Sequence, residues 1–360
     1  MIKLLASILI LTLFNACSSA PSQTGDTNES NDTTTSTTTE QSDDTATTES
    51  SESPAAEDDS GDANSETDTA TNTTTNSTED PAATNNDATS NTVIYEAGSE
   101  TNTYWVTNPA SDVKLFVKVR YPASWDGSVL PVMVLVPGGT GDSDDFGDDT
   151  TSSSGLIADE GFLVITFDPD GRGQSSGSEN QNGHIQQDGL AAILRFAAVV
   201  NGADVDKIGL VTFSFGITMG AGTLARYSDL NVKYLIDWEG PSDRNETGGC
   251  DSDGTGHLNG LISCDDESFW SEREAKTFIA LVTMPYQRLQ TKTDHAQPNY
   301  DHTLKMVNAA VDGLAPWVRL NEESPDQTYT KSTLPVMPPD TIDHFIMSEI
   351  ADMAKILLEL

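Results

Sequence analysis

The sequence predicts an α/β domain with a doubly wound, mostly parallel sheet. Short apolar runs rich in Val, Ile and Leu alternate with helical patterns between residues 113 and 236. Continuous apolar runs are typical of strands buried on both faces, as in parallel sheets. Alternation of strands and helices indicates crossover units, which are almost always right-handed. The loops that follow the strands should therefore meet at one edge of the sheet, where such folds bind ligands.

Each element is expected from its own local pattern. Apolar and charged residues alternate along 113–121, which predicts a half-buried strand, whereas the other strands are expected to be apolar throughout. Small residues dominate the helix expected after residue 216. The further strands are expected at 132–136, 162–167, 208–213 and 232–236, and the helices at 154–160, 188–200, 216–227, 301–311 and 345–358.

The first 17 residues have the pattern of an export signal. A short start containing Lys3 precedes an apolar run from Leu4 to Phe14, which is too short to span a bilayer. Cys17 after a small residue resembles a bacterial lipoprotein signal, and the resemblance implies an acylated Cys17 at the start of the mature chain. Phe14 stands where ordinary cleavage requires a small residue, which favours a lipid anchor in the cell envelope over free secretion.

Residues 18–92 have the composition of a disordered, acidic tether. The tract is rich in Thr, Ser, Asp and Glu, and it contains neither Lys nor Arg. Such a segment cannot bury enough apolar surface to offset its chain entropy. A glycosylated stalk is the alternative that the frequent Thr leaves open.

The domain is expected over residues 93–360, a length that suits one α/β domain with a full core. The whole chain has a formal net charge of −39 at pH 7. This charge argues against a nucleic acid or an anionic lipid surface as a partner. We expect a small-molecule, short-chain acyl or peptide substrate, with contact to a membrane only through the lipid anchor.

Ser214 is the predicted nucleophile. The segment Val211–Gly216 follows a buried strand and opens a helix of small residues. A serine on such a sharp turn needs small neighbours two positions away, and Gly216 meets this need. Thr212 stands where the usual motif has glycine. On this turn the amide of Phe215 would point at a developing oxyanion.

From residue 113 to the C-terminus, these features resemble the α/β-hydrolase superfamily, nearest to its dienelactone-hydrolase, cutinase-like and prolyl-oligopeptidase-like branches. The segment 135–140 resembles the loop that carries the second oxyanion donor, which implies the amide of Gly139, with Thr140 as the alternative. The segment 167–175 resembles a structural loop, so its charged residues are given no catalytic role. These are Asp168, Asp170 and Arg172.

The resemblance also implies the acid and the base, because the superfamily's chain order is serine, acid, histidine. His344 precedes the last helix, where the superfamily carries its catalytic histidine. Asp294 lies in a loop resembling Gly-X-X-Asp-X-X-X-Pro, with Thr291 in place of the glycine. An acid within 237–244, after the preceding strand, is the alternative.

The same segment is expected to shape the pocket. Trp238 and Glu239 are interpreted as pocket wall, and Arg244 as a residue that binds a substrate carboxylate or pairs with a neighbouring aspartate, Asp243 or Asp237. Residues 245–273 are expected to form an insertion over the site, acting as a small lid. In an exported protein its two cysteines, Cys250 and Cys264, predict a disulfide rather than a zinc site.

These features together predict an exported serine hydrolase that needs no cofactor or metal. The favoured reaction is cleavage of a carboxylic ester through an acyl-enzyme. A dipeptidyl or acyl-aminoacyl peptidase is the first alternative, with an acidic rim at Glu239 binding the amino terminus of a peptide. A non-catalytic surface binding protein on the same scaffold is the second.

Overall fold

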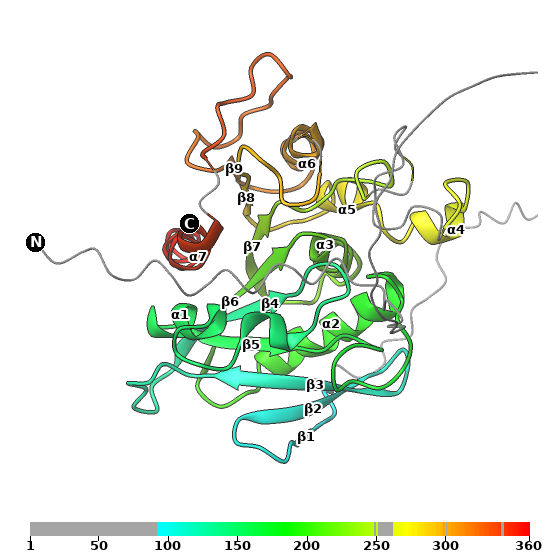
Figure 1. Ribbon diagram of the computed structural model, residues 1–360. Coiled ribbons are helices and arrows are strands. Elements are labelled where there is room, and N and C mark those ends of the chain that lie inside the picture. Colours follow the sequence, from blue (N-terminus) through cyan, green and yellow to red (C-terminus); the bar gives the residue numbers. More distant parts are fainter. Residues whose placement is uncertain (1–91, 248–249, 251–261, 298, 300, 340–341) are drawn as a thin grey trace, which may run out of the picture. The chain divides into compact units, whose positions relative to one another are not determined.

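The computed structural model describes residues 92–247, 250, 262–297, 299, 301–339 and 342–360, and only the backbone of 342–346 (Figure 1). The predicted signal and nearly all of the predicted tether lie outside these residues, as does much of the predicted insertion. Among the described residues, no helix combines the length and apolar character needed to cross a membrane.

The described strands form one sheet in the order β1-β2-β3-β5-β4-β6-β7-β8-β9. The first three strands and β5 pair antiparallel at one side, and the pairs from β5 to β9 are parallel. The mostly parallel sheet is therefore confirmed. The strands are β1 (Tyr95–Ala97), β2 (Thr103–Asn108), β3 (Val113–Arg120), β4 (Leu130–Val136), β5 (Leu163–Phe167), β6 (Ala203–Phe213), β7 (Val232–Trp238), β8 (Tyr286–Leu289) and β9 (Val318–Leu320).

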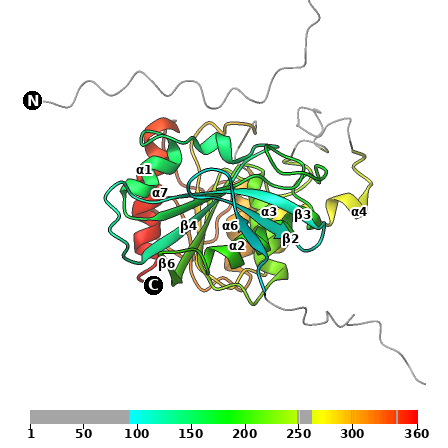
Figure 2. The ribbon, with the colours of Figure 1, turned by 90° about the horizontal axis from the view of Figure 1, so that it is seen from below.

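Helices cover both faces of this sheet, as the doubly wound prediction requires (Figures 1 and 2). One apolar cluster joins one face to α2 (His184–Ala197), α3 (Gly216–Arg226), α5 (Ala275–Ile279) and α6 (Asp301–Val311). A second cluster joins the other face to α1 (Ser153–Asp159) and α7 (Ile342–Leu357). The short helices η1 (Ser143–Phe146) and α4 (Glu267–Trp270) lie in loops.

The strand register brings four C-terminal strand ends level with one another. Val136 of β4 pairs with Thr212 of β6, and Phe213 pairs with Trp238 of β7. Trp238 in turn pairs with Leu289 of β8. Because the paired strands are parallel, the residues that follow each of these ends emerge side by side at one edge. This edge positions the candidate site.

Close packing at the start of α3 explains the residues around Ser214. A side chain at Gly216 would meet the carbonyl oxygen of Pro137 at 2.5 Å, so α3 can approach β4 only with glycine there. Thr212 fits where the usual motif has glycine because it faces Gly220 of α3, where an added Cβ would lie 2.4 Å from the Thr212 methyl. In the usual motif a glycine on the strand leaves room for the helix. Here the glycine on the helix, Gly220, leaves room for Thr212 on the strand.

Candidate active site

Ser214 occupies the sharp turn between β6 and α3. Its φ of 51° lies in the left-handed region, which costs a residue other than glycine about 1–3 kcal/mol. The turn is held in place because the Ser214 amide donates to the Trp238 carbonyl at 2.8 Å. Phe215 then has helical dihedrals and is the N-cap residue of α3, which begins at Gly216. The strained turn leaves the serine half-buried at the sheet edge.

A histidine and a carboxylate continue from Ser214 in an unbroken chain of contacts. The Ser214 hydroxyl lies 2.7 Å from Nε2 of His295, in the loop between β8 and α6. Nδ1 of His295 lies 2.8 Å from Oε2 of Glu239, the residue that follows β7. An imidazole that donates Nδ1–H to a carboxylate offers Nε2 as an acceptor for the hydroxyl proton. This arrangement activates a serine as a nucleophile.

Glu239 is held rigidly for this contact. Its side chain is only 1% exposed and its φ is 48°, again in the left-handed region. The Thr291 amide donates to Oε1 at 2.9 Å, and the Thr291 hydroxyl donates to the same oxygen. The amide of His295 donates to Oε2 at 3.2 Å. These donors fix the orientation of the carboxylate, and they explain a threonine at position 291.

Trp238 packs against one face of the His295 imidazole. Its ring stacks on the His295 ring with centroids 4.5 Å apart and an interplanar angle of 26°. The Trp238 side chain is 1% exposed, so it is part of the core rather than a wall of an open pocket. Its packing restricts the tilt of the His295 ring and so helps to keep Nε2 on the serine.

The loop after β4 passes directly over Ser214. An added Cβ at Gly138 would lie 3.0 Å from both the Ser214 Cβ and the Phe213 carbonyl oxygen. Only a residue without a side chain lets the backbone of this loop pack so closely against Ser214. Gly139 has a φ of +50°, which glycine adopts at little cost. On the other side, the Phe215 carbonyl accepts from Nδ2 of Asn182 at 2.9 Å. The amides of Gly139 and Phe215, with Thr140 as the alternative, stay the predicted oxyanion donors.

The histidine and carboxylate at Ser214 are not the two expected from the sequence. Asp294 lies 3.6 Å from His295 Nδ1, farther than Glu239, and accepts instead from the amides of Ala296 and Gln297 at 2.9 and 2.8 Å. His344 lies in the first turn of α7, and its side chain is outside the described residues.

The observed arrangement still follows the expected order of serine, acid and histidine along the chain. Glu239 lies within the segment 237–244 that was the alternative location for the acid, although it was interpreted there as pocket wall. His295 received no role from the sequence because the family pattern placed the acid at Asp294 and the base at His344, before the last helix. The signal that could have found it is its place in the loop after the strand next to β7.

The guanidinium of Arg244 is paired with two glutamates. It donates to Glu274 at 2.6 Å and to Glu267 at 2.9 Å, and it lies over the Trp270 ring. The alternative expectation, that Arg244 pairs with Asp243 or Asp237, is wrong. Of those aspartates, Asp243 contacts Lys276 and Lys305, and Asp237 contacts Arg288.

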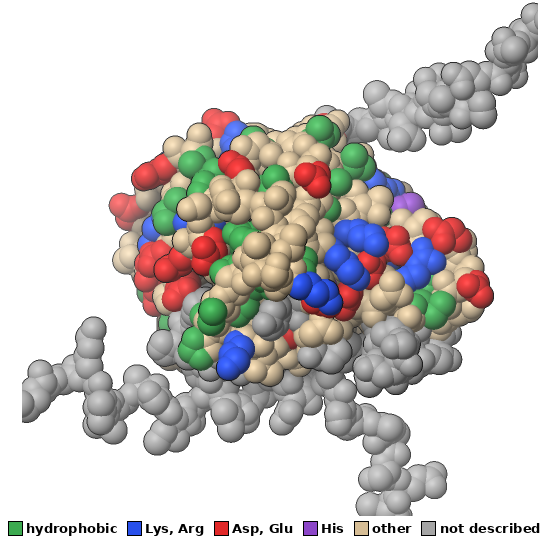
Figure 3. All heavy atoms as spheres, turned by 90° about the horizontal axis from the view of Figure 1, so that it is seen from above, with side chains coloured by type: hydrophobic (Ala, Val, Ile, Leu, Met, Phe, Trp, Pro, Cys, Tyr) green, Lys and Arg blue, Asp and Glu red, His purple; other side chains and the backbone are tan. Residues whose placement is uncertain are grey.

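The described part of the insertion is tied to the domain by such contacts. Cys250 and Cys264 form a disulfide with a Cα–Cα distance of 5.4 Å, and the Cys264 carbonyl accepts from Arg244 at 3.1 Å. Arg273, 3% exposed on its side chain, donates to the carbonyl of Gln181 at 2.9 Å. Figure 3 shows basic and acidic side chains lying side by side on one face of the domain, as ion pairing requires.

The charged residues of the loop after β5 have structural contacts. Asp168 accepts from the amides of Ser143 and Gln174 at 2.9 and 2.6 Å. Asp170 accepts from Asn108 at 2.9 Å, and Arg172 donates to Glu179 at 2.6 Å. These contacts connect the loop to neighbouring segments, and none of the three charged side chains contacts Ser214 in them.

Glu239, Asp294 and His295 also form a group with the donor types that bind metal ions, because their donor atoms lie within 4.8 Å of one another. The hydrogen bonds already described use the same atoms. Nδ1 of His295 faces Glu239, and its Nε2 faces the serine. A metal bound to Nδ1 of His295 would have to displace its hydrogen bond with Glu239, so the geometry fits a hydrogen-bonded relay better than a metal centre.

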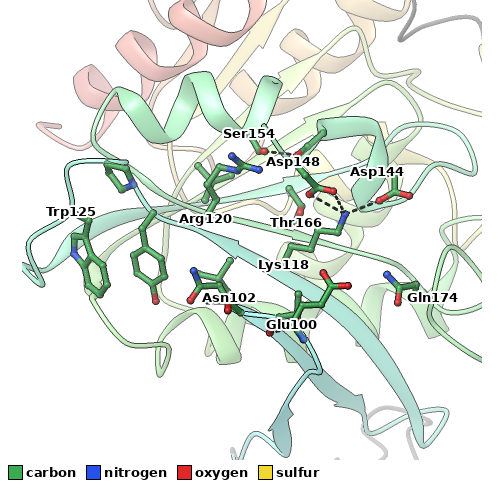
Figure 4. Close-up of a pocket in the computed structure, with 17 residues that line it drawn as sticks. Glu100, Asn102, Lys118, Arg120, Trp125, Asp144, Asp148, Ser154, Thr166 and Gln174 are labelled. Atoms are coloured by element: carbon green, nitrogen blue, oxygen red, sulfur yellow. Dashed lines mark hydrogen bonds and ion pairs between the residues drawn. The ribbon is translucent and has the colours of Figure 1, made fainter. Parts of the chain in front are cut away.

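A polar groove of about 720 Å³ runs along β3, apart from these residues (Figure 4). Lys118 lies between Asp144 and Asp148, at 2.7 and 2.9 Å, and Trp125 and Arg120 also line the groove. Neither Ser214, His295 nor Glu239 lines it. The groove is therefore separate from the candidate active site.

Comparison with known proteins identifies the fold. No family model and no curated protein matches the sequence. DcsB, solved with a substrate analogue, is 15% identical over 71% of this chain and 98% of its own, with a TM-score of 0.52. Est1E from Butyrivibrio proteoclasticus is 13% identical over 72% of this chain and 100% of its own, with a TM-score of 0.50.

Dipeptidyl peptidase 4 from Porphyromonas gingivalis is 16% identical over 71% of this chain, with a TM-score of 0.51, but the match spans only 35% of that protein. At such identities these likenesses show the fold alone. The domain has the α/β-hydrolase fold, which confirms the resemblance found in the sequence.

Proposed function

We propose that this α/β-hydrolase domain is a serine hydrolase that cleaves a carboxylic ester through an acyl-enzyme. One observation carries the proposal, namely the chain of contacts from the Ser214 hydroxyl to His295 at 2.7 Å and from His295 to Glu239 at 2.8 Å. A nucleophile, a base and a group that orients the base are the parts this chemistry needs.

In the proposed mechanism, His295 takes the Ser214 proton at Nε2 as the serine oxygen attacks the ester carbonyl. The amides of Gly139 and Phe215 stabilise the oxyanion, because donors fixed in advance need no reorganisation as the charge develops. His295 then gives the proton to the leaving alcohol. Water, deprotonated by the same imidazole, releases the acid and regenerates the serine. Glu239 stabilises the imidazolium and keeps Nε2 directed at Ser214.

The position of Glu239 favours an ester over a peptide with a free amino terminus. The exopeptidase alternative depended on an acidic rim at this residue, but the Glu239 side chain is 1% exposed and its oxygens contact Thr291 and His295. It cannot also bind a substrate ammonium. We therefore retain the ester as the proposed substrate class, with an acyl-aminoacyl peptide, which has no free amino terminus, as the alternative.

Labelling with a fluorophosphonate probe tests the proposal. Such probes react with activated serines, so the native protein is expected to be labelled and Ser214→Ala to remain unlabelled. A Ser242→Ala variant, which changes another buried serine near the same edge, serves as the control and should label fully. Folded native protein that takes up no probe would leave only the binding-protein alternative. A panel of short- and long-chain esters beside peptide anilides would then identify the substrate class.

We also propose that the mature chain is exported and anchored to the cell envelope through an acylated Cys17. The short apolar run before Cys17 supports this proposal. In a bacterial host, native protein should fractionate with membranes and take up labelled palmitate, and Cys17→Ser should lose both properties. Retention of Cys17→Ser in the membrane with normal processing would refute the anchor.

A further inference from the structure

A second carboxylate lies beside the His295 imidazole, and the proposed mechanism gives it no part. Asp294 Oδ1 is 3.6 Å from Nδ1 of His295, on the ring edge that also contacts Glu239. We infer that Asp294 is a positioning residue that stabilises protonated His295, and that a buried network through His302 and Arg288 holds it there. This inference rests on the proposed function, because it concerns a residue that supports His295, the proposed catalytic base.

Both oxygens of Asp294 have defined partners. Oδ1 accepts the amides of Ala296 and Gln297 at 2.9 and 2.8 Å, which closes the turn that presents His295. Oδ2 accepts from Nε2 of Gln290 at 3.0 Å and lies 3.0 Å from Nε2 of His302. Asp294 is 8% exposed. A buried carboxylate with four such neighbours has one orientation, so its charge stays fixed relative to His295.

The partners of His302 indicate its tautomer. The ring is fully buried, and its Nδ1 lies 3.1 Å from Nη2 of Arg288. A guanidinium can only donate, so Nδ1 accepts and the hydrogen lies on Nε2, which faces Asp294. The Gly240 carbonyl, 3.0 Å from His302 Nδ1, accepts from Nη1 of Arg288 at 2.7 Å. In this arrangement Arg288 orients His302, and Nε2 of His302 lies 3.0 Å from Oδ2 of Asp294.

Two carboxylates and one buried ion pair make up the charges described around His295. Glu239 and Asp294 face the imidazole directly, and behind them lie Asp237 and Arg288, which neutralise each other in a buried pair. Burial alone would raise the pKa of Asp294, but its contact with His302, the attraction of a protonated His295 and the Gln290 hydrogen bond lower it well below its usual value. Asp294 is therefore ionised throughout the range in which a histidine titrates.

The expected consequence is that His295 stays protonated to a higher pH in the native protein than in a protein without the second charge. An opposite charge within about 4–6 Å moves a titration by about 1–3 pH units. Because Asp294 is the more distant of the two carboxylates, Asp294→Asn should lower the titration midpoint of His295 by about one pH unit. The acid limb of kcat/KM, which reports neutral His295, should move to lower pH by the same amount. The plateau of kcat should fall up to about tenfold with KM unchanged.

The test follows the titration of His295 directly by NMR in full-length protein carrying Ser214→Ala and labelled histidine. With only 5 histidines in the chain, the His295 signal is assigned by its loss in His295→Gln. Asp294→Asn should lower the titration midpoint, and Asp294→Glu, which keeps a carboxylate at this position, should hold it near the native value. Asp301→Asn is the matched control. It removes the carboxylate of Asp301, the first residue of α6, which pairs with Lys331 and not with His295.

The decisive comparison is between Asp294→Asn and Asp301→Asn, which each replace one carboxylate by its amide. A midpoint that falls only in Asp294→Asn supports the inference. Equal midpoints in these two folded variants overturn it, as does a midpoint in Asp294→Glu that is as low as in Asp294→Asn. Because the titration needs no turnover, its failure is distinct from failure of the proposed hydrolase, which would appear as native protein that takes up no fluorophosphonate.

Discussion

Replacing His295 by alanine is expected to lower kcat for ester hydrolysis by about 10⁴-fold or more, with the fold intact. The Ser214 hydroxyl lies 2.7 Å from Nε2 of this imidazole, and without a base the hydroxyl is a poor nucleophile. Glu239→Gln should cost a similar factor, because an amide that donates to Nδ1 would leave the ring in the wrong tautomer. The measurement is steady-state kinetics on an ester found in the substrate panel.

His344→Ala is the matched comparison, because the sequence pattern assigned that histidine the same role. We expect it to keep kcat within about threefold of the native value, an order-of-magnitude bound for a residue outside the reacting groups. If His344→Ala were as inactive as His295→Ala, the active enzyme would have to use an arrangement other than the one described. A variant with both changes should be no slower than His295→Ala alone.

The second large effect concerns stability. Arg288→Met is expected to lower the free energy of unfolding by about 3–5 kcal/mol, because it leaves the carboxylate of Asp237 buried without its cation. Both side chains are fully buried, and Arg288 also donates to Gln290 at 2.8 Å. Urea denaturation followed by circular dichroism measures the loss. Lys355→Met breaks the half-exposed pair with Glu160 and should cost less than about 1 kcal/mol.

The double variant Arg288→Met with Asp237→Leu sharpens this prediction. If the loss arises from an unpaired buried charge, removing the charge as well should restore part of it, since apolar replacements of buried ion pairs are often neutral. Tyr286 would then lack the acceptor that its hydroxyl contacts at 2.8 Å, so recovery should be incomplete. An Arg288→Met protein as stable as the native one would show that water reaches this network.

Much of the fold was predictable because its signals are local. Apolar runs predicted β4, β5, β6 and β7 within a few residues, and helical spacing predicted α2, α3 and α6. The short strands β1, β2 and β9 lack such a run, because they lie towards the sides of the sheet and are less completely buried. β8 was not predicted because its four buried residues include Gln287 and Arg288, whose side chains also pair with the distant residues Asn321 and Asp237.

The sequence by itself determined the α/β class and the strand–turn–helix segment that carries Ser214, since both depend on residues close together in the chain. Only the tertiary structure decided which histidine and which carboxylate meet that serine. Asp294 and His295 are adjacent, yet one contacts His302 and the other Ser214, because the register of β7 and β8 sets where each residue emerges. Which of these two adjacent residues contacts Ser214 depends on strands that are far apart in the sequence, so no local sequence pattern could predict it.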